Sequence, residues 1–139
     1  MLLHASCVVI GGNAVLLTGP PGSGKSDLAL RLIDEGAKLV SDDQTMLHCE
    51  DDILLASPPE AIAGMIEIRH IGLAHMPFVA AVPVALCVEL SPLDQVLERL
   101  PEPDQVFFLD RPVQRLRLPS FAASTPAKIR AALSLLLTR

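Results

Sequence analysis

Eight consecutive residues near the N-terminus constrain this chain more than any other feature. Gly19 to Ser26 reads GPPGSGKS and matches the pattern G-x-x-x-x-G-K-S/T in full. The apolar run 14–18 (AVLLT) before it is typical of a strand buried on both faces. Apolar residues at helical spacing follow over 27–35, and Gly36 is placed to end that helix. Strand, glycine-rich loop and helix in this order predict a phosphate-binding loop.

The residue types of the loop suit a polyphosphate. Glycines allow backbone torsions that point successive N–H groups at one anion, and the helix N-terminus adds its positive dipole end. Lys25 supplies a charge for the β- and γ-phosphates, and the Ser26 hydroxyl is suited to Mg²⁺. The alternative is a glycine-rich turn with an incidental Lys-Ser pair. We expect a nucleotide site made of Gly19, Pro20, Pro21, Gly22, Ser23, Gly24, Lys25, Ser26 and Asp27.

Two carboxylates follow the next predicted strand. The short apolar segment 38–41 ends at Asp42 and Asp43. We expect it to pair in parallel with 14–18 through a right-handed crossover. Because carboxyl ends of neighbouring parallel strands line one crevice, both acids would lie beside the γ-phosphate. One would hold a metal or its waters, and the other would accept a proton from an attacking hydroxyl. A solvated turn that caps the strand is the alternative.

Three further residues are candidates for the site. Glu67 lies within a predicted strand over 65–69 and would face a metal, unless it forms an ion pair with Arg69 on a wet sheet face. His4 lies on the first predicted strand, which forms a hairpin with 14–18, and a histidine there is more often a structural hydrogen-bonding group. Arg99 lies near the end of a short predicted helix over 94–100. An interface, a surface or a phosphate-facing position are its alternatives, and the residues alone favour the surface.

The rest of the chain predicts an α/β domain with a mixed sheet and few helices. We take 1–139 as a single domain, because this length suits one compact unit. A helix that starts at Ser124-Thr125-Pro126 would pack across the sheet, with Ile129, Leu133, Leu136 and Leu137 inward. The other predicted elements are a hairpin of 45–49 with 53–56, a buried strand over 84–90 and an edge strand over 113–118.

Composition narrows the possible partners. Acidic residues outnumber basic ones by 16 to 11, which argues against nucleic acid or an anionic membrane surface as the main partner. No apolar run approaches the ~18–20 residues of a membrane span, and the N-terminus has no basic segment typical of a signal peptide. The three cysteines are widely spaced. We therefore expect a cytoplasmic protein in which all three are small buried hydrophobic residues.

The ordered set of motifs resembles the C-terminal catalytic domain of HPr kinase/phosphorylase, the bifunctional serine kinase of the phosphotransferase system. The segment 115–130 is similar to the short, single-domain alphaproteobacterial branch of that family. The resemblance implies a phosphate-loop kinase fold with a mixed sheet, similar to phosphoenolpyruvate carboxykinase. It is carried by His4-Ala-Ser, by 15–27, by Leu39-Val-Ser-Asp-Asp43, by Ile66-Glu-Ile-Arg-His-Ile-Gly72 and by 115–130.

The resemblance also implies roles for individual residues. ATP would bind Gly19 to Ser26, and Mg²⁺ would bind Ser26, Asp42 and Glu67. Asp42 would also assist the neighbouring Asp43. Asp43 would be the catalytic base in phosphorylation and the acid when inorganic phosphate cleaves phosphoserine. The remaining active-site matches are His4, Lys25 and Arg99.

The function that the resemblance implies is an ATP- and Mg²⁺-dependent kinase for an HPr-like phosphocarrier, with phosphorolysis and a homo-oligomer as further possibilities. His70 replaces the first glycine of the family's E-x-R-G-x-G signature, and 118–124 replaces a Pro-Gly-Arg-Asn stretch tied to dephosphorylation. The kinase reaction is therefore better supported than its reversal. A phosphate-loop kinase for a small metabolite and a non-catalytic ATP-sensing module are the alternatives.

Overall fold

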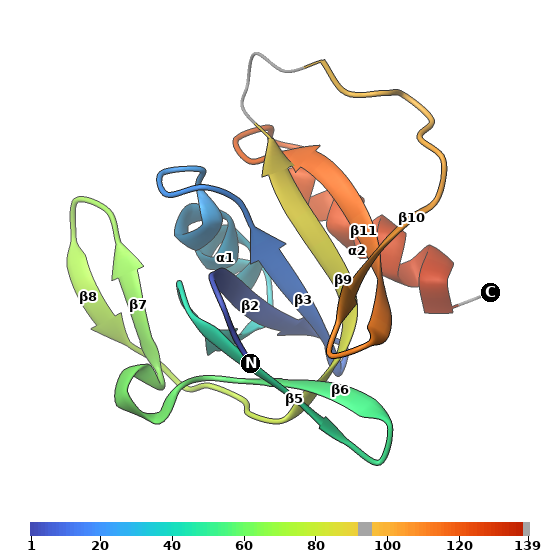
Figure 1. The fold of residues 1–139 in the computed structure, drawn as a ribbon. Helices are drawn as coiled ribbons and strands as arrows, with labels where there is room; N and C mark the ends of the chain where they lie inside the picture. Colours follow the sequence, from blue (N-terminus) through green and yellow to red (C-terminus); the bar gives the residue numbers. More distant parts are fainter. Residues whose placement is uncertain (92–95, 138–139) are drawn as a thin grey trace.

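The strand before the glycine-rich loop lies inside the sheet, as its apolar sequence predicts. The computed structural model describes residues 1–91 and 96–137. In it, β3 (Asn13–Thr18) is parallel to β9 (Val82–Ser91) and antiparallel to β2 (Ala5–Ile10). The prediction of a mixed sheet is confirmed (Figure 1). On one side of the sheet, β4 (Lys38–Ser41) pairs with β2. On the other side, β11 (Arg111–Pro119) pairs with β9, and β10 (Asp104–Phe108) pairs with β11.

The strand β2 separates two strands that we expected to be neighbours. It is antiparallel to both β3 and β4, with Cys7 opposite Leu16 on one side and Ser41 on the other. The prediction that β3 and β4 pair directly is therefore wrong, although they run in the same direction. The reason is the tight turn after β2, because the local hairpin occupies that edge of β3 and leaves only the far edge of β2 for β4.

A second group of strands continues from the first half of β9. Its residues Val82 and Pro83 pair with β6. The hairpin predicted around the acidic turn at 50–52 is confirmed as β5 and β6 (Figure 1). The elements of this part are β1 (Leu2–Leu3), β5 (Thr45–Glu50), β6 (Ile53–Ser57), the 3₁₀ turn Glu60–Ile62, and the separate two-stranded arm of β7 (Met65–Ile68) and β8 (Gly72–His75).

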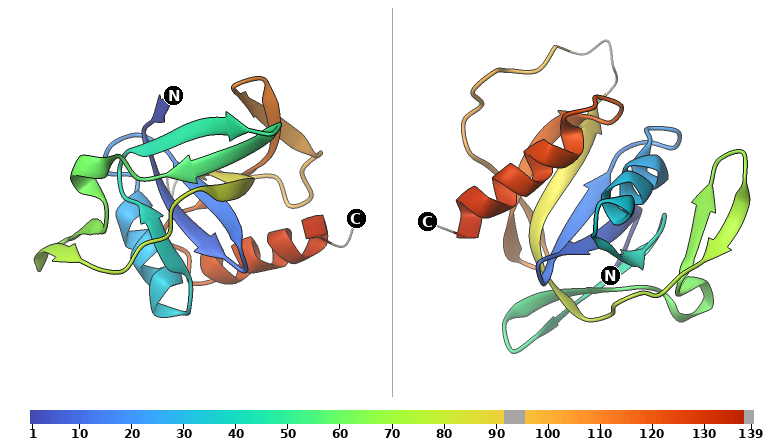
Figure 2. Two further views of the ribbon diagram at one scale, coloured as in Figure 1. Left: turned by 90° about the horizontal axis from the view of Figure 1, so that it is seen from below. Right: turned by 180° about the vertical axis from the view of Figure 1, so that it is seen from behind.

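Both helices cover one face of the sheet, and the β5–β6 hairpin covers part of the other (Figure 2). They are α1 (Lys25–Asp34) and α2 (Thr125–Leu137). Gly36 follows the C-cap residue of α1 with φ 113, so the predicted glycine stop is confirmed. Alternation along β3 fills both layers, because side chains on a strand alternate between faces. Val15 and Leu17 join the helix-side core, while Ala14 and Leu16 join the hairpin-side core. Among the described residues, no helix is long and apolar enough to cross a membrane.

The C-terminal helix packs across the sheet as predicted. Ile129 and Leu133 are buried in the core with α1, and Leu136 packs against it while partly exposed. The side chain of Leu137 lies outside the described residues. The helix begins at Thr125, which confirms the expected start.

Two predictions beyond β9 are wrong. Residues 96–100 of the expected helix 94–100 are irregular, and 92–95 lie outside the described residues. A short helix depends on packing an apolar face, and here Val96 and Leu100 are exposed. The strand β11 is also not an edge strand over its first half, because residues 111–115 pair with β10. The alternation of apolar and polar residues in this segment indicates a strand with one solvent-exposed face, and it fits a strand at the edge of the sheet as well as one inside it.

The cysteines differ from the expectation at one position. Cys7 and Cys87 are buried beside β3, and burial raises the pKa of both thiols. Cys49 is exposed. It lies on the same side of β5 as Thr45 and Leu47, but only one residue separates it from the hairpin turn at 51–52. The prediction that all three cysteines are buried is therefore wrong for Cys49.

This burial predicts selective thiol labelling. Since the thiolate is the reactive form, a buried thiol with a raised pKa reacts slowly. We expect a maleimide at neutral pH to modify Cys49 alone in the folded protein, and Cys7 and Cys87 in addition after denaturation. Mass spectrometry of the peptides measures this. Rapid native labelling of Cys7 would contradict the burial of β2.

The packing of α2 predicts a large loss of stability for Ile129→Ala. Ile129 is fully buried between the sheet and α1, and such a truncation costs about 2–5 kcal/mol. We expect Lys128→Ala, on an exposed position of the same helix, to change the free energy of unfolding by less than about 0.5 kcal/mol. Urea denaturation of both variants compares them. Equal effects would mean that α2 contributes little to the core.

Candidate active site

The glycine-rich loop joins the end of β3 to the start of α1. Gly24 precedes the helix with φ 96, and no side chain caps the first helical amides. The side chain of Lys25 turns back into the loop, where its Nζ donates to the carbonyl oxygens of Gly19 at 2.8 Å and Pro20 at 3.2 Å. It is buried, at 8% exposure. The loop therefore encloses a cation, and the uncapped amides beside it are free to receive an anion.

A buried carboxylate connects this loop to the sheet. Asp42 follows β4 and is 7% exposed. Its Oδ1 accepts hydrogen bonds from Ser26 Oγ at 2.7 Å and Ser6 Oγ at 2.8 Å, and its Oδ2 accepts one from the Glu67 amide at 3.0 Å. These three donors belong to α1, β2 and β7. Asp42 thus holds together the residues that the sequence predicts around a metal.

Asp43 has a different environment from its neighbour. Its backbone is left-handed, with φ 64, and its amide donates to Ser6 Oγ at 3.2 Å. The side chain is exposed, and no described residue donates a hydrogen bond to its carboxylate. Of this adjacent pair, one acid is engaged by three donors and the other is open to an incoming group.

Glu67 and His4 flank the same region. Glu67 is exposed on β7, and among the described residues it makes no ion pair with Arg69. The ion-pair interpretation of Glu67 therefore does not hold. His4 is exposed in the bend between β1 and β2 rather than on a strand. Because Ala5 pairs with Thr18, His4 comes next to the first residue of the glycine-rich loop.

An oxygen-rich set with few protein ligands suits Mg²⁺. The Ser26 hydroxyl and the Asp42 carboxylate are within hydrogen-bond distance, and Glu67 is joined to Asp42 through its amide. Among the described residues, no three histidine, cysteine, aspartate or glutamate side chains form a ready-made metal cluster. Mg²⁺ commonly takes one or two carboxylates and completes its shell with water and phosphate. The residues present fit that mode of binding.

Two predicted site residues lie apart from this cluster. The Asp27 side chain is exposed and forms an ion pair with Arg31 one turn along α1, at 3.0 Å. Arg99 is exposed in the irregular segment 96–103, and no described contact joins it to the glycine-rich loop or to Asp42 and Asp43. The surface position favoured for Arg99 from the residues alone agrees with the structure.

Sequence reasoning assigned no role to Ser6 and Phe121. Ser6 is fully buried and binds both Asp42 and Asp43; a lone serine in an apolar strand was the available signal. Phe121 lies against the loop, since a Cβ placed on Gly24 would come within 2.8 Å of its ring. Arg31 holds this turn by donating to the carbonyl oxygens of Ser120 and Ala122. The contact spans residues about ninety positions apart, which sequence patterns do not report.

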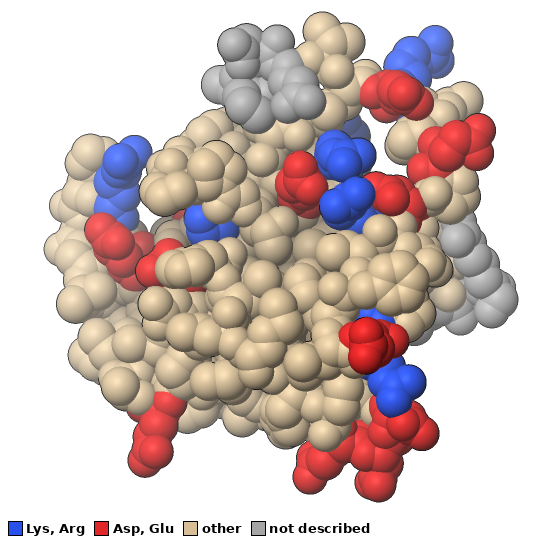
Figure 3. Space-filling view, viewed as in Figure 1, with Lys and Arg blue, Asp and Glu red and all other residues tan. Residues whose placement is uncertain are grey.

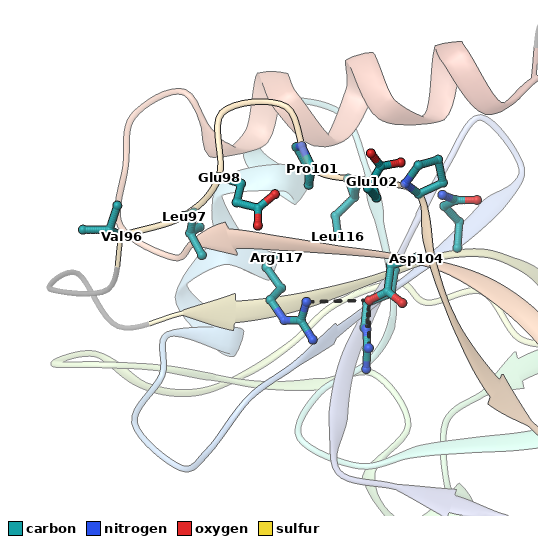
Figure 4. Close-up of a pocket in the computed structure, with 11 residues that line it drawn as sticks. Val96, Leu97, Glu98, Pro101, Glu102, Asp104, Leu116 and Arg117 are labelled. Carbon is teal, nitrogen blue, oxygen red and sulfur yellow. Dashed lines mark hydrogen bonds and ion pairs between the residues drawn. The ribbon is translucent and has the colours of Figure 1, made fainter.

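The structure has two pockets of note, of which only the smaller adjoins the glycine-rich loop. One of about 210 Å³ lies between residues 20–23 and the turn at Ser120 and Phe121. The other, of about 740 Å³, lies between the segment 96–103 and β11 (Figure 4). In the larger pocket Asp104 accepts a hydrogen bond from Arg115 at 2.8 Å, which lowers the pKa of that carboxyl group. Figure 3 shows acidic and basic side chains in mixed groups on this face.

Comparison with known proteins places this geometry in a family. The family model described as HPr Serine kinase C-terminal domain matches residues 1–129. A solved structure, the Hpr(Ser) kinase/phosphatase from Coxiella burnetii, superposes with a TM-score of 0.87 at 29% identity and covers 99% of this chain and 91% of that one.

Curated relatives agree with this match. The HPr kinase/phosphorylase of Clostridium kluyveri is 30% identical over 127 residues, which is 84% of this chain and 41% of that protein. That of Geobacillus thermodenitrificans is 43% identical over 75 residues, 53% of this chain and 24% of that protein. The chain thus spans less than half the length of these relatives. It belongs to the HPr Serine kinase C-terminal domain family.

Proposed function

We propose that this protein is an ATP- and Mg²⁺-dependent protein serine kinase that phosphorylates an HPr-like phosphocarrier. The observation that carries the proposal is the hydrogen bond from Ser26 to Asp42, with the free carboxylate of Asp43 beside it. It joins a glycine-rich loop to an acid pair, the two parts that phosphoryl transfer requires. Membership of the HPr kinase family supports this acceptor class.

In this proposal the glycine-rich loop is a phosphate-binding loop. The uncapped amides at the start of α1 donate to the β-phosphate, and the helix dipole favours its negative charge. Lys25 is held by carbonyl oxygens of its own loop. On nucleotide binding it exchanges these neutral acceptors for β- and γ-phosphate oxygens, because charge-assisted hydrogen bonds are the stronger ones. Such a loop within a mixed sheet also supports the likeness to phosphoenolpyruvate carboxykinase.

Ser26, Asp42 and Glu67 would hold Mg²⁺ beside the terminal phosphates. The ion supplies charge neutralisation of the β- and γ-phosphate oxygens when bound. Within the chain, Asp42 orients the Ser26 hydroxyl at 2.7 Å, and the Glu67 amide fixes the arm of β7 and β8 against the same carboxylate. The buried acid thereby positions the other two groups.

Asp43 is the proposed general base. As the acceptor serine Oγ forms its bond to the γ-phosphorus, the bond from that phosphorus to the bridging oxygen of ADP breaks, and the serine proton passes to Asp43. In phosphorolysis, an oxygen of inorganic phosphate forms a bond to the phosphoserine phosphorus as the bond from that phosphorus to the serine Oγ breaks. Pyrophosphate leaves, and the same group returns a proton to the serine oxygen. The exposure of Asp43 gives a protein acceptor access to it. His4, at the other end of the loop, and Arg99 stay proposed participants on the resemblance alone.

The two alternatives have less support. A small-metabolite kinase closes a set of arginines over the phosphates, but Arg111, Arg115 and Arg117 are each paired with a carboxylate, those of Asp52, Asp104 and Glu89. A non-catalytic ATP sensor does not need a carboxylate without hydrogen-bond donors beside its phosphate site. Asp43 is such a carboxylate among the described residues, and it therefore favours a catalytic role. We also propose that residues 1–139 act as one catalytic domain, with a homo-oligomer as a possible assembly.

The phosphate-binding role of the loop predicts the effect of Lys25→Ala. Removing the charge that faces the phosphates costs one or two charge-assisted hydrogen bonds, so we expect ATP affinity to fall on the order of 10- to 100-fold. Calorimetric titration with ATP and Mg²⁺ measures it. Lys38→Ala, on an exposed lysine of β4, is the matched control and keeps wild-type affinity. Unchanged binding in Lys25→Ala would count heavily against the phosphate loop.

A substitution of the proposed base separates nucleotide binding from phosphoryl transfer. Asp43→Asn keeps the shape of the turn but removes the base, so we expect unchanged ATP affinity and phosphotransfer to an HPr phosphocarrier reduced about 10²- to 10⁴-fold. Labelled ATP follows the transfer. The control is Asp51→Asn, another exposed aspartate with a left-handed backbone, φ 50, outside the site. Transfer at the wild-type rate by Asp43→Asn would refute the role of this residue.

A further inference from the structure

One pocket beside the glycine-rich loop has no part in the chemistry proposed above. It is lined by Pro20, Pro21, Gly22 and Ser23 of the loop, by Leu90 and Ser91 at the end of β9, and by Ser120 and Phe121. Its volume is about 210 Å³, less than the roughly 300–1,000 Å³ of pockets that enclose a whole small molecule. It is therefore suited to a fragment of a ligand whose remainder lies elsewhere.

The order of strands places this pocket opposite the acid pair. Across the sheet the order is β11, β9, β3, β2, β4. Asp42 and Asp43 follow β4 on one side of the loop, whereas the pocket adjoins the ends of β9 and β11 on the other side. A nucleotide with its terminal phosphate beside the acids would extend across the loop toward β9 and β11, so its nucleoside end comes to the pocket.

The walls of the pocket have the chemistry of a site for a flat heterocycle. Two prolines, Leu90 and Phe121 supply apolar surface, and the ring of Phe121 remains half exposed, at 51%. Its position is fixed by hydrogen bonds from Arg31 to the carbonyl oxygens of Ser120 and Ala122.

Resting on the proposed function, we infer that this pocket receives the base of the bound nucleotide, with Phe121 as the aromatic wall on which the base stacks. Pro20 and Pro21 form the loop side of the pocket. Phe121 is therefore a residue that determines affinity for a nucleotide over a bare polyphosphate. Stacking of a base on an aromatic side chain corresponds to about 10- to 100-fold in affinity.

The test compares ATP with inorganic tripolyphosphate, which has the phosphates without the nucleoside. Calorimetric titration in the presence of Mg²⁺ gives both affinities for the wild type, Phe121→Ala, Phe121→Leu and Phe121→Tyr. We expect Phe121→Ala to weaken ATP about tenfold or more and tripolyphosphate less than twofold. Phe121→Tyr retains both affinities. Phe121→Leu keeps an apolar contact for Gly24 without a ring, and it weakens ATP selectively as well.

The controls separate stacking from folding. Phe107→Ala removes a phenylalanine that is 64% exposed on β10, away from the loop, and leaves both affinities unchanged. Thermal unfolding of each variant measures stability, and the leucine and tyrosine variants carry the comparison if alanine destabilises the turn.

Each outcome has one meaning. Equal loss of ATP and tripolyphosphate in the Phe121 variants, or no loss of either, overturns the base pocket and leaves the phosphate loop intact. Failure of the wild type to bind ATP and tripolyphosphate overturns the proposed function and the pocket together.

Discussion

The buried carboxylate of Asp42 is the interaction on which the site depends. An ionised acid at 7% exposure is stable only when donors replace the water that it loses. Here two serine hydroxyls and one backbone amide do so, and they come from α1, β2 and β7. The three hydrogen bonds to this one carboxylate therefore fix α1, the sheet and the arm of β7 and β8 relative to one another.

The position of β2 between β3 and β4 makes this arrangement possible. Ser6 lies on β2, so its hydroxyl reaches the Asp42 carboxylate and accepts from the Asp43 amide at the same time. With β3 and β4 adjacent, as the sequence suggested, no residue of β2 would lie between the glycine-rich loop and the acids. The inserted strand also leaves Asp43 in a left-handed turn with its carboxylate exposed, which keeps two neighbouring acids in different environments.

The turn before α2 contacts the glycine-rich loop on the side away from Asp42. Phe121 packs over Gly24, and the turn that carries it is tied to α1 by Arg31. In this chain that turn stands where the resemblance expects a Pro-Gly-Arg-Asn stretch. A second departure from the family pattern is His70, which stands in place of the signature's first glycine. Its backbone is left-handed, with φ 72, a conformation that glycine adopts without strain. The turn between β7 and β8 thus holds His70 in a left-handed backbone conformation.

The sequence by itself determined the parts whose cause is local. Periodicity and turn residues predicted β3, the loop, both helices and the β5–β6 hairpin, because alternation, glycine torsions and helix ends depend on neighbouring residues. The motif and its ordered companions pointed to Ser26, Asp42, Asp43 and Glu67, which the structure brings to one edge of the sheet.

Only the tertiary structure decided the relations between distant segments. The insertion of β2, the exposure of Cys49, the irregular path of 96–100 and the contact of Phe121 with Gly24 all depend on which surfaces remain uncovered once the sheet assembles. Pairing partners, and burial at positions such as Cys49, are set by packing across the whole chain, and a pattern within a window of a few residues does not decide them.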